Sequence, residues 1–414
     1  MIKRNIDKQL YQSLQRKEIT ILVGARQVGK TTLLQSIMNT LIKGGEQVLF
    51  LNMDIESDAR ILLSQESLVN RIQLEFGNSH GYVFIDEIQH KQDAGRFLKG
   101  LYDMQLPYKF FVTGSGSLEL KEMISEALTG RKHLIEMHPV SFSEYLDYKT
   151  SYSYTDRLDE YCRIEPVKLL GFLYEYLTYG GYPKVITSDT SALKYEVMDE
   201  IFTSYITKDI TYLLGVRSPE KFTRLIQLLA VQCGGILNQA QLASDVGIAV
   251  ETVSKYLWYA EQTFVIENIR PYFTNSKKEL TKSPTIYFID LGMCNYGRNR
   301  YGLQVSNSDG FLFQNFIFQL LRYRFQHGVT KINYWRTKDK AEVDFIIHDK
   351  GEVIPVEVKF SELKKTTISR SFRSYIDKYQ PVKAFLVSLS GRPAMILGKT
   401  RIEFIPFWHL MFGI

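Results

Sequence analysis

Short runs of apolar residues alternate with stretches of helical periodicity through the first 150 residues of the chain. The four runs, rich in Ile, Val, Leu and Phe, are Thr20–Val23, Val48–Leu51, Tyr82–Ile85 and Phe110–Thr113. A strand that is apolar at successive positions is buried on both faces, as in a parallel sheet covered by helices. The pattern therefore predicts an α/β domain with a buried parallel sheet over residues 1–150.

The pattern changes after Tyr145. Leu146 to Arg157 carries Tyr, Ser, Thr and Asp with little apolar periodicity, which is typical of a linker. Val167 to Leu229 then has a helical pattern, interrupted by a turn signal at Gly180-Gly181-Tyr182-Pro183. We therefore expect a helical connector over residues 151–219.

A helix-turn-helix is predicted from residue 237 onward. Asn238 is suited to cap a helix, and Gln241 follows three residues later, as in a capping box. Gly247 supplies the turn, and Val250 to Tyr259 has the pattern of a second helix.

Two strands with a basic segment between them follow the second helix. The strands are predicted at Val265–Phe273 and Thr285–Ile289. The basic residues between them are Lys277, Lys278 and Lys282. This order is typical of a winged helix, which we expect over residues 220–290. A basic wing favours contact with DNA, but such modules also pack between domains, and the sequence leaves both alternatives open.

The last part of the chain has the pattern of a second α/β unit, expected over residues 291–414. One helix is predicted at Phe311–Phe325 and another around Ile368–Tyr379. The predicted strands are Ile332–Trp335, Glu342–His348, Glu352–Phe360 and Ala384–Ser388. The fold class predicted for the whole chain is therefore α/β multidomain, with helical and winged-helix segments between the two α/β units.

A glycine-rich loop joins the first predicted strand to the helix after it. The segment is Gly24-Ala25-Arg26-Gln27-Val28-Gly29-Lys30-Thr31-Thr32, which matches the P-loop pattern GxxxxGKS/T between a strand and a helix. Its glycines let backbone N–H groups turn toward phosphate oxygens, and the start of the helix adds a positive end. We expect Lys30 to reach the β- and γ-phosphates and Thr31 to ligate Mg²⁺.

Further candidates for this site lie downstream of the loop. Asp86 and Glu87 follow the third strand, and buried acids are costly unless a cation offsets them. We expect Asp86 to hold Mg²⁺ through water and Glu87 to polarise the attacking water. Ser115, after the fourth strand, is expected to sense the γ-phosphate. Arg131 is a candidate arginine finger, in cis or from a neighbouring subunit, with a structural arginine as the alternative.

Composition narrows this picture only slightly. The guanine-reading pattern N/TKxD is absent, which favours ATP over GTP. The formal net charge of +6 permits a nucleic-acid partner without requiring one. Cys162, Cys233 and Cys294 are widely spaced and indicate neither a disulfide framework nor a zinc site. With no run of about 18 apolar residues and no signal-peptide core near the start, we expect a cytoplasmic protein without a membrane partner.

A series of motifs, spread in order over nearly the whole chain, resembles a known family. The motifs are GARQVGKTTLL, VFIDEIQ, TGSGSLEL, LTGR, PVSFSEYL, GGYP, PTIYFIDLGM and EVDFIIHDKGEVIPVEVKF. The family is that of prokaryotic AAA-type ATPases whose C-terminal half carries a restriction-endonuclease-like region of uncharacterised role. The resemblance implies an AAA-like P-loop domain with ATP and Mg²⁺ as ligands, and a C-terminal restriction-endonuclease-like domain.

A second group of polar residues flanks a predicted hairpin turn at Lys350-Gly351. That turn would place Asp344 opposite Glu357 and Glu342 opposite Lys359. Because side chains alternate between the faces of a strand, Glu357 and Lys359 share one face. Two opposed carboxylates repel each other, and a bound divalent cation would relieve that repulsion.

This arrangement resembles the PD-(D/E)XK nuclease pattern. The resemblance implies that Asp344 and Glu357 bind a second Mg²⁺ or Mn²⁺ and that Lys359 orients the hydrolytic water in phosphodiester cleavage. Related chains usually carry a glutamate on the preceding helix, where this sequence has Gln314, which puts nuclease activity in doubt. The alternatives are a nuclease fold without activity and a polar sheet face with a Glu342–Lys359 pair.

Together these features predict an ATP-driven enzyme acting near DNA, in which the ATPase domain is coupled through the middle segments to the nuclease-like end. The alternative is a regulatory nucleotide switch that binds a protein partner and carries an inactive nuclease-like domain. Gln314 and the mild net charge favour that alternative. The sequence leaves a homo-oligomer open.

Overall fold

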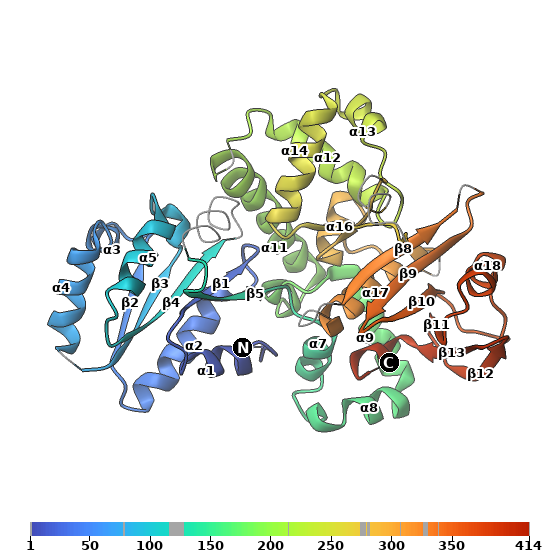
Figure 1. Cartoon of the computed structure of the whole chain (residues 1–414), viewed down its shortest axis with the longest axis horizontal. Helices are drawn as coiled ribbons and strands as arrows, with labels where there is room; N and C mark the ends of the chain where they lie inside the picture. The colour runs from blue at the N-terminus through green and yellow to red at the C-terminus, as the bar shows by residue number, and fades with distance from the viewer. Residues whose placement is uncertain are drawn as a thin grey trace.

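The computed structural model describes residues 2–77, 79–115, 128–213, 215–273, 279, 282–306, 308–325, 330–337 and 339–413. Two β-sheets lie toward opposite ends of the molecule, one blue to cyan and one orange to red (Figure 1). Green and yellow helices from the middle of the chain lie between and above them. Within the described residues, no helix combines the length and apolar character needed to cross a lipid bilayer.

The N-terminal sheet is parallel throughout, with strand order β2-β3-β4-β1-β5. Its strands are β1 (Ile19–Gly24), β2 (Val48–Asn52), β3 (Gly81–Asp86), β4 (Tyr108–Ser115) and β5 (Lys132–Met137). All six residues of β1 and of β3 are buried, as their continuous apolar runs predicted. The expected parallel sheet is confirmed, while the edge strand β5, whose exposed and buried residues are mixed, was not predicted.

Helices cover both faces of this sheet. They are α1 (Asp7–Ser13), α2 (Lys30–Lys43), α3 (Glu56–Ile61), α4 (Gln65–Phe76) and α5 (Ala94–Asp103), with a short turn η1 (Ile88–His90) after β3. Helix α2 buries Leu34 and Ile37, which recur at helical spacing on one face. The helix that starts at Lys30 is thereby fixed against the sheet that carries the glycine loop.

The linker expected from Leu146 is wrong at its start. Helix α7 (Phe142–Lys149) continues through Leu146, and both Tyr145 and Leu146 are buried. The helix begins with a complete capping box, in which the side chains of Ser141 and Glu144 each accept the other's backbone N–H. Tertiary packing of the aromatic residues outweighs the weak periodicity of the segment.

The middle of the chain is helical, as expected. Its helices are α8 (Leu158–Ile164), α9 (Pro166–Tyr179), α10 (Pro183–Ile186), α11 (Ser191–Ser204), the π-helix η3 (Tyr205–Leu213) and α12 (Pro219–Val231), with a short turn η2 (Thr155–Arg157) before α8. The predicted turn separates α9 from α10, and Gly180 adopts φ +78° there. A side chain at Gly180 would also collide with Asp290, whose carboxylate accepts the N–H of Gly181 at 2.7 Å.

The predicted helix-turn-helix and two strands are present, but the first strand ends at Ile269, well before the predicted end at Phe273. They are α13 (Gln239–Val246), α14 (Val250–Gln262), β6 (Ile266–Ile269) and β7 (Thr285–Phe288), and the strands pair antiparallel. Asn238 caps α13 by accepting the N–H of Gln241 at 3.1 Å, and Gly247 takes φ +72°. Lys277 and Lys278 lie outside the described residues. Helix α16 (Leu291–Gly297) follows β7 and packs against α9 and α12.

The C-terminal sheet has the order β12-β13-β11-β10-β9-β8 among the described residues. Its strands are β8 (Lys331–Arg336), β9 (Glu342–Asp349), β10 (Glu352–Val358), β11 (Lys383–Ser388), β12 (Arg392–Leu397) and β13 (Thr400–Pro406). Its helices are α17 (Gly310–Phe325) and α18 (Arg370–Tyr379), with a final turn η4 (Phe407–Met411). Strands β12 and β13 were not predicted. The expected hairpin is present, with Asp349 paired to Glu352 across Lys350-Gly351.

One hydrophobic core runs through all of these parts. It includes Val83 of β3, Leu225 of α12, Phe288 of β7 and Phe345 of β9. A second core, which includes Phe372 of α18, covers the other face of the C-terminal sheet. Because the first core is continuous, the helical middle of the chain is packed against both sheets.

Candidate functional site

The glycine loop lies at the carboxyl end of β1, between the sheet and α2. Gly29 has φ +100°, a conformation that glycine adopts without the penalty of a side chain. Gly24 is required for another reason, because a Cβ there would lie 2.2 Å from the carbonyl oxygen of Met137 on the neighbouring strand. The sequence therefore folds into a tight loop whose backbone is close to β5.

Lys30 is held inside this loop. Its side chain is 6% exposed, and Nζ donates to the carbonyl oxygens of Gly24 and Ala25, each at 2.9 Å. Burial lowers the pKa of Lys30, while the carboxylates of Glu87 and Asp209 act in the opposite direction. The two carboxylates partly offset the cost of burying the ammonium group, which lies at the place where a P-loop lysine meets phosphate.

Thr31 and Asp86 meet as the sequence predicted. The Oγ1 of Thr31 donates to Oδ2 of Asp86 at 2.9 Å, and Asp86 is only 1% exposed. The Oγ1 of Thr113 donates to the other carboxylate oxygen and accepts the backbone N–H of Glu87 at 3.3 Å. Hydroxyl and carboxylate oxygens are hard donors of the kind that Mg²⁺ prefers, so this group fits that ion.

Thr113 is a site residue that sequence reasoning missed. The predicted sensor was Ser115, two positions further along β4, and the side chain of Ser115 lies outside the described residues. The sequence could have indicated Thr113, because Thr113 and Ser115 both lie at the end of β4 and residues two positions apart on a strand share one face. Thr113 orients Asp86 and the Glu87 backbone at once.

Glu87 projects from a strained position just after β3. It adopts φ +56°, uncommon for a residue with a side chain, and Gln89 donates to its Oε2. Such strain is found at functional sites, where the surrounding structure fixes it. Glu87 lines the same cavity as Lys30 and Thr31.

That cavity, of about 580 Å³, lies between the glycine loop and the helical connector. The loop side includes Arg26, Gln27, Gly29 and Thr32. The connector side is lined by Pro183, Lys184, Thr187, Glu200, Ser204 and Lys208. No local pattern near the loop predicted this second wall, because its residues are more than 150 positions away in the chain.

Arg131 lies at the other end of the sheet. Its carbonyl oxygen accepts the N–H of Ile19, the first residue of β1, whereas the glycine loop follows the last. Its Nε donates to Asp103 at 2.8 Å. An arginine finger in cis does not fit this position, and a finger for a neighbouring subunit stays a prediction.

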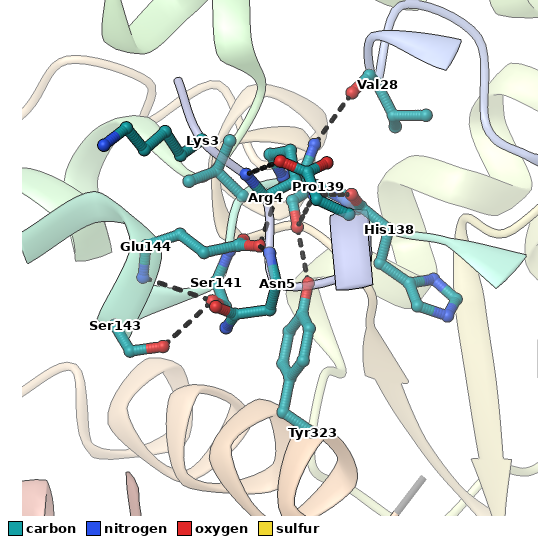
Figure 2. A network of polar contacts seen from close by, with 12 residues as sticks. Lys3, Arg4, Asn5, Val28, His138, Pro139, Ser141, Ser143, Glu144 and Tyr323 are labelled. Carbon is teal, nitrogen blue, oxygen red and sulfur yellow. Dashed lines mark hydrogen bonds and ion pairs between the residues drawn. The ribbon is translucent and has the colours of Figure 1, made fainter. Parts of the chain in front are cut away.

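A buried network joins the glycine loop to the C-terminal part of the chain (Figure 2). Arg4 donates from Nη1 to the carbonyl oxygen of Val28 at 3.1 Å and from Nη2 to those of His138 and Pro139. Tyr323 of α17 donates its hydroxyl to the same Pro139 carbonyl. One carbonyl therefore receives bonds from both the N-terminal segment and α17.

The second predicted group assembles at the C-terminal sheet. Asp344 accepts the N–H of Val358 on Oδ2 at 2.7 Å, and its Oδ1 accepts the amide Nε2 of Gln314 at 3.0 Å. Gln314 also donates to the hydroxyl of Tyr287 at 2.9 Å. Burial raises the pKa of Asp344 to about 7, with Glu357 adding to the rise. An amide donor thus contacts the carboxylate where the nuclease pattern has a third acid.

Glu357 and Lys359 share a face, as predicted. Nζ of Lys359 lies 2.8 Å from Oε1 of Glu357, while Oε2 of Glu357 is buried without a hydrogen-bond partner among the described residues. Burial works against the charge on Lys359, but its bond to Glu357 raises the pKa of Lys359. The alternative with a Glu342–Lys359 ion pair is wrong, since Glu342 pairs with Arg336 at 3.3 Å.

Neither location gathers a metal-binding cluster of protein side chains by itself. In the described part of the chain, no three His, Cys, Asp or Glu residues come together in a way that could hold a metal ion. At the glycine loop, this agrees with an ion that shares its ligands with a nucleotide and water. At the C-terminal sheet, Asp344 and Glu357 supply carboxylates, and the amide of Gln314 contacts Asp344 where the resemblance to the nuclease pattern implies a third acid.

Family comparisons divide the chain into three parts. Residues 16–146 match the model of an AAA domain. Residues 171–303 and 309–410 match two models described as domains of unknown function, DUF8612 and DUF4143. The first match agrees with the P-loop geometry, so the chain carries an AAA-type, ATPase-like domain at its N-terminal end.

Relatives from distant organisms match along most of the chain. An uncharacterized protein of Methanocaldococcus jannaschii is 26% identical, over 99% of this chain and 90% of that protein. One of Haemophilus influenzae is 26% identical over 92% of both chains, and one of Mycobacterium tuberculosis is 26% identical over 93% of this chain and 79% of that one. The combination of parts therefore recurs, without an assigned activity.

Solved structures give weaker matches. AMPPCP-bound DnaA from Aquifex aeolicus has a TM-score of 0.31 and 13% identity, over 63% of this chain and 90% of that one. Cdc6p from Pyrobaculum aerophilum has a TM-score of 0.29 and 11% identity, over 73% of this chain and 95% of that one. At these TM-scores, the likeness carries no argument about the site.

Proposed function

We infer that this protein is a magnesium-dependent ATP hydrolase of AAA type, with its nucleotide bound between the glycine loop and the helical connector. The contact of Thr31 with Asp86, beside the buried Lys30, is the observation that carries this proposal. Lys30 and Thr31 open α2 just after β1, and Asp86 ends β3, which is separated from β1 by β4 in the sheet. Together they supply a cation for phosphate and oxygens for Mg²⁺.

Each residue has a role in that reaction. The N–H groups of the loop and the ammonium of Lys30 bind the phosphates, which requires Nζ to exchange its carbonyl partners for phosphate oxygens. Thr31 and Asp86 would hold Mg²⁺, which supplies charge neutralisation on the β- and γ-phosphates when bound. Glu87 orients and polarises the attacking water, and Thr113 fixes both acids. Ser115, at the end of β4, would sense the γ-phosphate.

Arg131 enters the proposal only through a second copy of the chain. Its pairing with Asp103 leaves the guanidinium partly exposed at the amino end of the sheet. A neighbouring subunit in a homo-oligomer would therefore receive this arginine at its own nucleotide. A hydrolysis rate per protein molecule that stays constant as the protein concentration is raised would count against this arrangement.

The direct test measures ATP binding and phosphate release with Mg²⁺. Lys30→Ala is expected to weaken nucleotide binding by more than about tenfold, since it removes a charged hydrogen-bond donor. Glu87→Gln is expected to keep binding and to lose hydrolysis by about 100-fold or more. Lys43→Ala, at the exposed far end of α2, is the matched control. If Lys30→Ala hydrolyses ATP like the wild type, the proposal is wrong.

A second candidate function is phosphodiester cleavage at the C-terminal sheet, which would make the protein an ATP-driven enzyme acting on DNA. The unpartnered Oε2 of Glu357, next to Asp344 and Lys359, favours it. In this chemistry Asp344 and Glu357 would hold Mg²⁺ or Mn²⁺, which activates water when bound.

The competing proposal is a regulatory nucleotide switch with an inactive nuclease-like domain and a protein partner. The Gln314–Asp344 bond favours the switch, because an amide already satisfies the carboxylate. DNA binding separates the two, since an affinity that falls steeply with salt indicates phosphate contacts. Cleavage of DNA with Mn²⁺ that disappears in Lys359→Ala would exclude the switch reading.

A further inference from the structure

A charge pair joins the glycine loop to the helical connector. Nε of Arg26, the third residue of the loop, donates to Oδ1 of Asp209 at 2.8 Å. The two side chains are only 17% and 7% exposed, and they are 183 positions apart in the chain. Asp209 lies on η3, and π-helical turns occur preferentially at functional sites.

Arg26 is placed to meet a ligand as well as Asp209. It lines the nucleotide cavity together with Lys30 and Thr31. A guanidinium is planar and carries five N–H donors, so it can bind phosphate through two parallel hydrogen bonds. An arginine within a phosphate-binding loop is therefore a natural phosphate ligand, unless another anion holds it.

Asp209 is that anion, and its charge interacts with the charges of Lys30 and Glu87. Lys30 and Glu87 both act on Asp209, and Asp209 acts in return on Lys30. Burial raises the pKa of Asp209, and the charge of Arg26 opposes the rise. Because the Asp209 carboxylate interacts electrostatically with Lys30, phosphates that bind this lysine should repel the carboxylate.

We propose that Arg26 is a phosphate-binding residue of the nucleotide site and that Asp209 competes with the nucleotide for it. The inference rests on the proposed ATP-binding function and adds a link between nucleotide and connector. Binding of the phosphates draws Arg26 away from Asp209 and releases η3 from the loop.

Another side-chain hydrogen bond joins the glycine loop to the connector, but it is longer and more exposed than the Arg26–Asp209 pair. Gln27 reaches Glu200 at 3.4 Å, and Lys184 holds the same glutamate at 2.9 Å within the connector. Both side chains of the Lys184–Glu200 pair are more than half exposed, and such pairs contribute little. Loss of the buried pair therefore changes how firmly the connector is attached to the loop.

The test combines charge-removing variants with nucleotide titration. The probe is a fluorescent, non-hydrolysable ATP analogue with Mg²⁺, added to the full chain. Asp209→Asn is expected to bind it about threefold to tenfold more tightly, and Arg26→Gln about tenfold more weakly. The double variant should bind only slightly more tightly than Arg26→Gln, because Asp209 acts mainly through Arg26, with its charge near Lys30 as a smaller effect. Glu175→Gln removes a connector acid paired with Lys194 and is the matched control.

A second measurement needs no variant at Asp209. Amide hydrogen exchange within Tyr205–Leu213 should become faster when the analogue is added to the wild type, and it should stay unchanged in Lys30→Ala. Slower exchange there would overturn the proposal. Equal weakening by Asp209→Asn and Arg26→Gln would overturn it too, since it would make the pair a mere packing contact.

The outcomes also separate this inference from the proposed function. If the wild type fails to bind the analogue at all, the ATP-binding proposal itself is wrong. If the wild type binds and Lys30→Ala does not, while Arg26→Gln binds normally, the ATP-binding proposal stands. The inference that Arg26 binds phosphate in competition with Asp209 is then refuted.

Discussion

Arg4 forms a buried ion pair with Glu144, in which Nε lies 3.3 Å from Oε1, and each side chain is less than a tenth exposed. The same guanidinium donates to Val28 within the glycine loop. Glu144 in turn accepts the N–H groups of Asn5 and Ser141. The start of the chain, the loop and α7 are therefore fixed by one cluster of charges (Figure 2).

Breaking this pair should be costly. Arg4→Met leaves Glu144 buried without its cation, and we expect it to lower the free energy of unfolding by about 3 kcal/mol. Urea denaturation followed by circular dichroism measures the change. The control is Arg60→Met, which removes an arginine paired with Glu56 where both are mostly exposed, and which should cost less than about 1 kcal/mol. Similar losses for the two variants would contradict the buried role of Arg4.

Thr113 should matter for catalysis rather than for binding. Thr113→Val keeps the shape of the side chain but removes the hydroxyl that holds Asp86 and the Glu87 backbone. We expect kcat to fall about tenfold to 100-fold with KM nearly unchanged, because the acids lose their alignment. Steady-state ATP hydrolysis measures this. Thr20→Val is the control, since its buried hydroxyl has no hydrogen-bond partner among the described residues.

Gln314→Glu should create the metal site that the nuclease pattern implies. The new carboxylate would lie beside Asp344 in place of the amide, and three acids favour a divalent cation. Calorimetric titration with Mn²⁺ should show binding stronger by at least about tenfold than in the wild type. The added site should be absent from a Gln314→Glu, Asp344→Asn double variant. Equal Mn²⁺ affinity in wild type and Gln314→Glu would contradict this reading.

Asp344 should make stability depend on pH. Its pKa of about 7 in the folded protein lies above its ordinary value of 3.8. The folded state therefore keeps a proton that the unfolded chain releases, so the stabilisation is complete below about pH 4 and is lost as pH rises through 7.

Between pH 5 and pH 8, we expect the wild type to lose about 1–3 kcal/mol of stability from Asp344. Asp344→Asn cannot ionise and should lack this loss. Urea denaturation at both pH values measures it, and Asp349→Asn, at the other end of the same strand, is the control. An identical pH dependence in wild type and Asp344→Asn would show that Asp344 does not ionise in this range.

The sequence was most informative where one local pattern determines both structure and chemistry. The segment from Gly24 to Thr32 requires a strand, a tight turn and a helix in succession, so its geometry follows from adjacent residues. Asp86 was predictable because a buried strand leads to it. The pairing of Asp344 with the residues around Glu357 followed from a two-residue turn, whose register extends along the hairpin.

Contacts between distant parts of the chain were beyond this reasoning. Nothing near Arg26 indicates Asp209, and nothing near Arg4 indicates Pro139, because both pairings join segments more than 130 positions apart in the chain. The mistaken linker has the same cause, since Tyr145 packs against Phe172 and Tyr176, which come from a later part of the chain. Lys359 forms its ion pair with Glu357 rather than with Glu342, because Arg336, on the adjacent strand, pairs with Glu342.

Helix α7 has a practical consequence for dissecting this protein. The ring of Phe142 packs 5.1 Å from that of Phe316 on α17 and 6.0 Å from that of Phe407 near the chain's end. A fragment cut at residue 150 would lose both of these rings and expose Phe142 to water. Expression of residues 1–150 alone should therefore lead to aggregation, and an inactive fragment would say nothing about the intact chain.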